Sequence, residues 1–284
     1  MSPRRADAEL LAATAMWGLS FVVLKQSLAA STPLAFVALR FALGALVLLP
    51  FAPSPWRWTR AELRDGVLLA VLFVTGFATQ MVGMQYTTPS RSAFIIASSS
   101  VIAPLIAVVV VRERPHALLV AALAVAAVGV YLLTAPDAGG LNRGDLWTLV
   151  TAVAFGGQIF AASTLGPRHD PRRLALLQIT LTALGATLAT VVLEDPRVSW
   201  TPALFAGLGY AAVIATALAL LLQLRAQRHM TATRASILFC AEPLFAATTA
   251  WWWLGETLSA AQWAGGALVL AAMVLVELPR RPAG

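Results

Sequence analysis

Two charged side chains fall near the middle of long apolar stretches. Glu242 lies within the apolar run 231–254, and Arg40 lies within the run 32–52. A charge at the bilayer centre costs about 2.5–3.5 kcal/mol on insertion scales, so such groups face a partner or a water-filled cavity. The two side chains could clamp the ammonium and carboxylate groups of an amino acid, or form a gate. Two structural alternatives stay open: an ion pair buried between helices, and an Arg40 that extends along its stem to the membrane surface.

Uncharged polar and aromatic side chains inside apolar runs extend this candidate site. Trp17 lies about midway along its run, one turn before Phe21, and could form an apolar wall; packing against lipid is the alternative. Gln80, Gln158 and Gln223 could bind a solute or only bridge helices, where such hydrogen bonds contribute about 0.6–2 kcal/mol. The predicted substrate-binding residues are Trp17, Phe21, Arg40, Gln80, Phe94, Gln158 and Glu242.

Two prolines fall inside apolar runs that carry polar residues. Proline has no N–H, so Pro243 leaves the carbonyl of Phe239 without its usual helical donor. We expect Pro104 and Pro243 to mark kinks that act in gating, although prolines are also ordinary in membrane helices.

The elements that must position these residues are ten apolar segments, which fill almost the whole chain of 284 residues. A helix rises about 1.5 Å per residue and a hydrocarbon core is about 30 Å thick, so each segment can cross a bilayer. We therefore expect an all-α integral membrane protein with ten transmembrane helices. The segments are 9–29, 32–52, 65–86, 90–111, 116–135, 144–164, 173–193, 203–224, 231–254 and 259–278.

Composition supports a membrane protein and argues against other classes. The chain is 59% hydrophobic and 12% charged, with a mean hydropathy of +0.79, whereas soluble domains carry about 25% charged residues. The net charge of +7 comes from basic residues in short groups between apolar runs, which form no continuous face for nucleic acid. The single cysteine, Cys240, excludes a disulfide framework and a cysteine metal site. The expected partner is the lipid bilayer.

The positions of the arginines predict the orientation. With the N-terminus in the cytoplasm, fourteen arginines fall in inner segments, while only Arg143 and Arg197 fall in outer loops. Such a bias is typical of membrane proteins and here requires an even number of spans. Arginine-rich, alanine-rich composition suggests a bacterial source. We therefore expect a multi-pass protein of the bacterial inner membrane with both termini in the cytoplasm.

An internal repeat divides the chain into two units. Nearer the N-terminus, a shift of 138 in the numbering pairs Trp17-Gly18 with Phe155-Gly156. Further along, a longer shift of 143 pairs Gln80 with Gln223, Thr88 with Thr231, Arg91 with Arg234, Glu113 with Glu256 and Pro136 with Pro279. We predict two five-helix repeats, residues 1–137 and 138–284. Because five is odd, the second is inverted, an arrangement typical of secondary transporters. Accidental similarity between apolar helices is the alternative.

Glu113 and Glu256 each follow one predicted helix and precede the next. A carboxylate in that place can accept N–H bonds from a helix start and favours its positive dipole end. We expect a structural role for both residues, with a gate at the membrane surface as the alternative.

Several motifs resemble one transporter family. Residues 17–25 (WGLSFVVLK) resemble the first-helix signature of EamA-type carriers of the drug/metabolite transporter superfamily. Residues 242–245 (EPLF), 254–259 (LGETLS) and 262–266 (QWAGG) resemble the last two helices of that family. Residues 112–115 (RERP) are similar to the equivalent turn of the first half. The resemblance covers the full chain and is most specific near its C-terminus.

The resemblance implies ten helices in two inverted five-helix units. It also implies export of amino acids, related metabolites or drugs, and the aromatic amino acid exporters are the most similar members. The two halves differ in one respect. Pro104 precedes Glu113 by nine residues, whereas Pro243 precedes Glu256 by thirteen, so the two kinks need not lie at equivalent depth.

The expected function is export of amino acids, above all aromatic or other apolar ones, and of related small metabolites by alternating access. Alternatives are a multidrug or other metabolite carrier of the same fold, a non-transporting membrane subunit and an intramembrane lipid-modifying enzyme. Enzymatic chemistry has little support, because no histidine pair has metal-ligand spacing and no glycine-rich phosphate loop occurs. We expect no cofactor and no metal. The oligomeric state stays open, and a monomer is compatible with the sequence.

Overall fold

The computed structural model describes residues 3–54, 57–111, 117–133, 140–230, 235, 238–239 and 241–276. Within these residues the fold is helical, and the only β-type pairing is an isolated bridge between Ser31 and Val198 in two connecting loops. Several residues used in the sequence analysis lie outside the described part: Arg112, Glu113, Arg114, Pro115, Pro136, Thr231, Arg234, Cys240 and Pro279.

The first half of the chain forms helices close to the predicted segments. They are α1 (Pro3–Ser27), α2 (Pro33–Leu48) with the 3-10 turn η1 (Leu49–Phe51), α3 (Arg60–Met84), α4 (Pro89–Ala97), α5 (Ser99–Val111) and α6 (Ala117–Leu133). The predicted run 90–111 is therefore two helices that break at Ser98.

The second half repeats this order. Its helices are α7 (Arg143–Leu165) with the 3-10 turn η3 (Gly166–Arg168), α8 (Pro171–Leu193), α9 (Pro202–Gly209), the π-helical stretch η4 (Tyr210–Leu218), α10 (Ala219–Gln227), α12 (Glu242–Leu254) and α13 (Ala260–Val276). The predicted run 203–224 is one continuous rod whose middle, η4, is wider than an α-helix.

Seven helical stretches among the described residues are long and apolar enough to cross a membrane, and shorter apolar helices accompany them. The protein is thus a multi-pass membrane protein, whereas the count of ten spans stays a prediction. The seven stretches are Arg4–Ser27, Pro33–Phe51, Arg60–Met84, Pro89–Val110, Arg143–Arg168, Pro171–Leu193 and Pro202–Gln227.

Local sequence explains where the helices start. At α4, the Thr88 side chain accepts a hydrogen bond from the Arg91 N–H, and Pro89 occupies the first turn, where its missing N–H costs nothing. At α7, Asn142 and Asp145 form a reciprocal capping box. These caps place Arg91 and Asp145 at the ends of their helices, next to the connecting loops.

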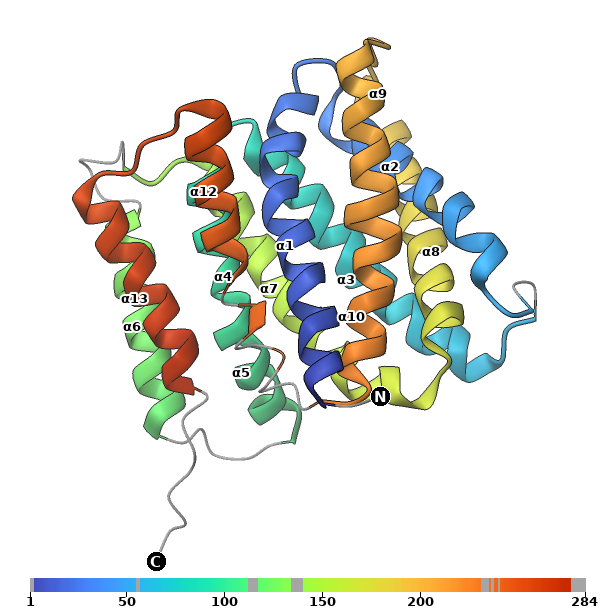
Figure 1. The fold of residues 1–284 in the computed structure, drawn as a ribbon, viewed down its shortest axis with the longest axis horizontal. Helices are drawn as coiled ribbons and strands as arrows, with labels where there is room; N and C mark the ends of the chain where they lie inside the picture. The colour runs from blue at the N-terminus through green and yellow to red at the C-terminus, as the bar shows by residue number, and fades with distance from the viewer. Residues whose placement is uncertain are drawn as a thin grey trace, which may run out of the picture.

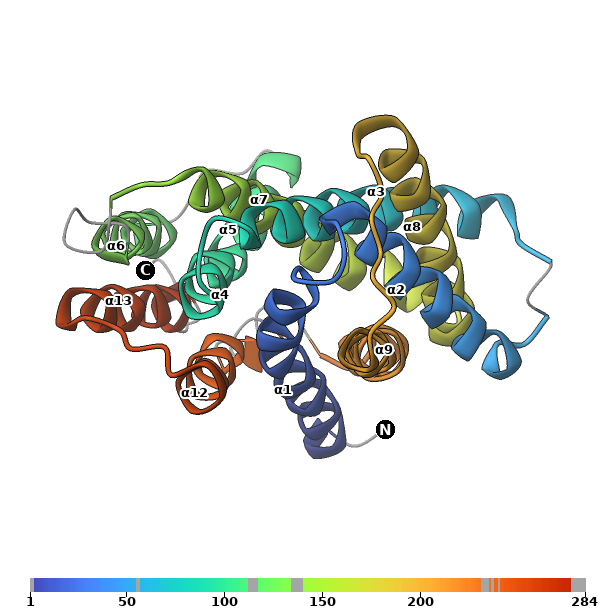
Figure 2. The same cartoon turned by 90° about the horizontal axis from the view of Figure 1, so that it is seen from above.

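The helices form an elongated bundle of two layers (Figures 1 and 2). One layer contains α13, α12, α1 and α9, and the other contains α6, α4, α7, α3 and α8. Helix α2 packs between α8 and η4 near one end, and α6 pairs with α13 at the other. In Figure 1, α1 begins at the same side of the bundle at which α13 ends, as an even number of crossings requires.

The first helix of each half packs against helices of the other half. Helix α1 packs against α10 and α12 of the second half, while α7 packs against α3, α4 and α5 of the first. The centre of the molecule therefore lies between helices of both halves, and this is where the cavity described next is found.

Candidate substrate-binding cavity

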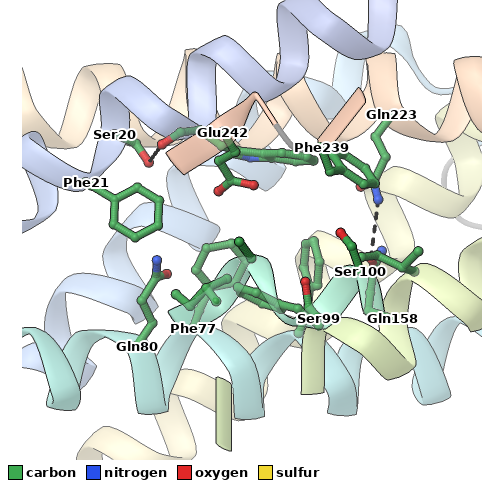
Figure 3. A pocket seen from close by; sticks show the side chains of 16 residues that line it. Ser20, Phe21, Phe77, Gln80, Ser99, Ser100, Gln158, Gln223, Phe239 and Glu242 are labelled. Atoms are coloured by element: carbon green, nitrogen blue, oxygen red, sulfur yellow. Dashed lines mark hydrogen bonds between the residues drawn. The ribbon is translucent and has the colours of Figure 1, made fainter. Parts of the chain in front are cut away.

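A cavity of about 600 Å³, its open mouth included, lies between α1, α3, α4, α5, α7, α10 and the start of α12 (Figure 3). Both halves of the chain contribute to its wall. The lining residues are Trp17, Ser20, Phe21, Phe73, Phe77, Gln80, Ile96, Ala97, Ser99, Ser100, Phe155, Gln158, Ile159, Gln223, Phe239 and Glu242.

The structure brings five of the seven predicted substrate-binding residues to this wall: Trp17, Phe21, Gln80, Gln158 and Glu242. Arg40 and Phe94 are elsewhere. The Phe94 ring is buried and lies so close to Gly266 of α13 that a Cβ on that glycine would be 2.7 Å from it. Phe94 therefore packs α4 against α13 and does not line the cavity.

Glu242 is the first residue of α12, and its carboxylate points into the cavity (Figure 3). The carboxylate makes no hydrogen bond or ion pair with any residue that the structure describes. Its place in the first turn of α12 puts the negative charge at the favourable end of the helix dipole. A carboxylate that faces a cavity without a protein partner can bind a solute that enters the cavity.

Arg40 is fully buried but turns away from Glu242. Its Nε donates to Thr216 Oγ1 at 2.6 Å and its Nη2 to the Ala215 carbonyl at 3.1 Å, both in η4. The guanidinium lies 4.6 Å from the centre of the Phe77 ring, and Phe77 stands in the cavity wall. Neither sequence-based alternative for Arg40, an ion pair with Glu242 or extension to the membrane surface, is the observed arrangement. Arg40 instead joins α2 to the widened helix.

Trp17 lines the cavity and is held in place by its indole. Its Nε1 donates to the Ala215 carbonyl at 2.8 Å, and its ring centre lies 6.1 Å from that of Phe239. The alternative of packing against lipid is therefore not observed. One carbonyl of η4, that of Ala215, accepts hydrogen bonds from both Trp17 and Arg40.

The glutamines bridge helices and still offer polar atoms. Gln223 Nε2 donates to Gln158 Oε1 at 3.3 Å across the cavity, as the dashed line in Figure 3 shows. Three buried atoms have no partner in the described part of the protein: Gln80 Oε1, Gln223 Oε1 and Gln158 Nε2. Buried polar groups are nearly always hydrogen-bonded, so these atoms are available to a solute or water. Gln158 thus bridges helices, as one of the two alternatives expected, and it also lines the cavity; its binding of a solute stays a prediction.

The two prolines stand in different places. Pro104 lies inside α5, but Pro243 occupies the first turn of α12, where its missing N–H breaks no helical hydrogen bond. The positions at which the helices break are nevertheless equivalent: Ser98 follows the end of α4 and Ala241 precedes the start of α12, and the longer repeat shift relates these two residues. The breaks thus match in the repeat although the prolines do not.

Sequence reasoning missed most of the aromatic wall, namely Phe73, Phe77 and Phe239, and it noted Phe155 only as a repeat partner of Trp17. The repeat itself contained part of the signal. The shorter repeat shift relates Phe21 to Ile159, and the longer one relates Ile96 to Phe239 and Ser99 to Glu242. Residues matched to the predicted site would have been correct candidates.

A second buried charge cluster lies beside the α3–α4 connection. Arg91 donates to Asp145 through Nη2 at 2.5 Å and Nε at 2.8 Å, which joins the start of α4 to the start of α7. Glu256 accepts a hydrogen bond from the Ser90 N–H at 3.4 Å. Glu256 thus contacts a helix start, as expected, but that of α4 and not of the helix that follows it.

A multi-pass helical bundle around a central polar and aromatic cavity has the architecture of a membrane carrier. The model of the EamA-like transporter family matches residues 5–135 and again residues 142–278. This protein belongs to the EamA-like transporter family, and it is a membrane transporter.

Relatives agree with this assignment. An uncharacterized transporter of Archaeoglobus fulgidus is 30% identical over 96% of this chain and 86% of its own length. The uncharacterized inner membrane transporter YicL of Salmonella typhimurium is 26% identical over 99% of this chain and 97% of its own. A solved crystal structure, described only as that of a protein, has a TM-score of 0.71 at 17% identity over 98% of both chains, which shows the fold alone.

Proposed function

We propose that this protein is a secondary transporter that exports apolar or aromatic amino acids and related small amphipathic metabolites by alternating access. The observation that carries the proposal is the central cavity, in which the Glu242 carboxylate has no partner among the described residues and lies opposite aromatic rings. A carboxylate suits an amino group, and the rings suit an apolar side chain. A multidrug carrier of the same fold is the second candidate, because the wall is rich in aromatic residues.

The mechanism follows from two inverted five-helix units, residues 1–137 and 138–284, that rock about the cavity. Contacts at equivalent positions support such units. A Cβ on Gly18 of α1 would lie 2.5 Å from Phe245 Cβ, and one on Gly156 of α7 would lie 2.8 Å from Ile102 Cγ2. The shorter repeat shift relates the two glycines, and the longer one relates Ile102 to Phe245. These close crossings are the pivots that we infer.

We place both termini in the cytoplasm and the protein in a bacterial inner membrane, because of the arginine distribution. Cysteines introduced beside Arg60 and Arg168, in a Cys240→Ser background, should then resist an impermeant thiol reagent in intact cells. Labelling of either loop from outside would contradict this orientation.

Counterflow in proteoliposomes tests the transport function. Liposomes loaded with one unlabelled aromatic amino acid, or with a mixture of amphipathic metabolites, should accumulate the labelled solute only when they contain the protein. Empty liposomes and the Glu242→Gln variant are the controls, and the solute is recovered to check that it is chemically unchanged. Covalent conversion without movement would favour an intramembrane enzyme, and an absence of both would contradict the proposal.

A further inference from the structure

The charge in the described wall of the cavity has one sign only, which limits the class of substrate that the cavity can bind. Among the described residues that line the cavity, Glu242 has the only ionisable side chain. A zwitterionic amino acid would bring a carboxylate as well as an ammonium group. The ammonium group would find an opposite charge there, and the carboxylate would not.

The basic residues that could pair with the carboxylate of a substrate make their hydrogen bonds elsewhere. Arg40 donates to Thr216 and Ala215 behind the Phe77 ring; its Nη1 has no partner among the described residues, but Arg40 does not line the cavity. Lys25 Nζ donates to the carbonyls of Met84 at 2.6 Å and Thr87 at 2.9 Å, at the end of α3. None of these cationic groups lines the cavity.

Arg91 is likewise held outside the cavity, by Asp145 and by the carbonyl of Gly140. A buried carboxylate without a counter-charge or sufficient donors is strongly unfavourable. The unpaired amide Nε2 of Gln158 and the unpaired hydroxyl of Ser100 are neutral donors and do not supply the charge of a cation.

The neutral part of the wall favours a cation as well. Oε1 of Gln80 and Oε1 of Gln223 are buried acceptors without partners among the described residues, and an ammonium group has three N–H donors. The faces of aromatic rings attract cations through their quadrupole, most strongly when water is excluded. Trp17, Phe21 and Phe155 supply such rings in the wall of the same cavity.

We propose that the cavity selects amphipathic protonated amines: Glu242 recognises the amino group, whereas none of the described residues that line the cavity offers a carboxylate a cationic partner. This inference rests on the proposed transport function, and within the proposed range of substrates it favours the related amines over the amino acids themselves. Amines and amino alcohols with an apolar or aromatic body should be preferred over the amino acids of the same shape. Arg40, which was expected from the sequence to bind the carboxylate of an amino acid, does not line the cavity.

A matched series of four probes with one phenyl body tests the selectivity: phenylethylamine, phenylalaninol, phenylalanine and 3-phenylpropionate. The full-length protein in lipid nanodiscs is incubated with radiolabelled phenylethylamine at pH 7, and each of the other three compounds is tested as a competitor. Phenylethylamine and phenylalaninol should bind at least about ten-fold more tightly than phenylalanine, since only phenylalanine must bury a carboxylate without a compensating partner. 3-Phenylpropionate should not compete.

Two variants separate recognition from folding. Glu242→Gln should lower the affinity for both amines about ten-fold or more. Phenylalaninol should still bind more tightly than phenylalanine, because the carboxylate of phenylalanine still meets no counter-charge. Glu256→Gln makes the same change outside the cavity and should leave the amine affinities and the ranking intact. Equal or tighter binding of phenylalanine, or unchanged amine binding by folded Glu242→Gln, would overturn the inference. Counterflow of phenylalanine in the same preparation would then leave the transport function standing, whereas no flux and no binding of any probe would overturn both.

Discussion

Two carboxylates inside this bundle, those of Glu242 and Asp145, have opposite surroundings. The Glu242 carboxylate faces a cavity and has no partner among the described residues. The Asp145 carboxylate, fully buried, accepts from Arg91, from Thr87 Oγ1 at 3.2 Å and from the Asn142 N–H at 2.9 Å. A charge whose bonds are all made inside the protein holds helices together. A charge without a protein partner beside a cavity can bind a solute that enters the cavity.

The difference follows from the cost of burial. Moving an ion from water into a medium of low dielectric constant is unfavourable unless opposite charge and hydrogen bonds compensate it. For Asp145 the protein supplies this compensation, and it does so between α4 and α7, which belong to different halves. For Glu242 we infer that the solute supplies it. The predictions below test this contrast, in order of decreasing expected loss of stability.

Removal of one partner of the satisfied pair should have the largest effect. Asp145→Asn leaves the Arg91 guanidinium buried without its counter-charge, which costs about 3–5 kcal/mol. Thermal unfolding of the purified variant in detergent measures the loss. The double variant with Arg91→Gln should recover part of it, because no buried charge is then left alone. A loss well below about 1 kcal/mol for Asp145→Asn would show that the pair does not hold the helices.

The close helix crossing beside Glu242 should tolerate little added volume. In Gly18→Ala, the new Cβ would lie 2.5 Å from Phe245 Cβ and 2.8 Å from the Glu242 carbonyl oxygen, so α1 and α12 must move apart. Overpacking of this kind costs about 1–3 kcal/mol. Gly209→Ala is the control, because a Cβ there meets nothing within 4 Å and alanine favours the helix by about 0.5–1 kcal/mol. Similar melting temperatures for the two variants would contradict the close contact.

Trp17→Phe tests the hydrogen bond that fixes the cavity wall. The ring is largely kept, but the donor to the Ala215 carbonyl is lost. We expect a loss of only about 0.5–1.5 kcal/mol, because Arg40 still donates to the same carbonyl. The ranking of aromatic against aliphatic substrates should shift, as measured by competition in counterflow. If transport of every substrate falls in proportion to folded yield, Trp17 only packs.

Neutralising the open charge should change stability least and transport most. Glu242→Gln removes a carboxylate that has no partner in the described structure, so unfolding should shift by less than about 1 kcal/mol while transport and its pH dependence change. Arg40→Gln and the double variant complete the cycle. Because Arg40 bonds to η4 and not to Glu242, the two effects should add within about 0.5 kcal/mol. Recovery of stability in the double variant would reveal an ion pair after all.

Much of the site was predictable, for a clear physical reason. Charged and amide groups are costly inside apolar segments, so Glu242, Gln80 and Gln158 stood out without a structure, and each lines the cavity. Arg40 satisfied the same criterion and lies elsewhere, and so does Phe94, the other predicted binding residue that does not line the cavity. Sequence places a residue along a helix, but not the direction in which its side chain faces.

The sequence by itself determined that this chain is helical, crosses a membrane several times and belongs to a transporter family, because long apolar runs and repeated motifs are local properties. Only the tertiary structure decided that Arg40 bonds to η4, that Pro243 begins a helix and that Phe73 and Phe77 form a wall. These outcomes depend on how each helix is rotated about its axis and which neighbour it meets. Nearly all faces of these helices are apolar, so hydrophobic periodicity carries little information about that rotation.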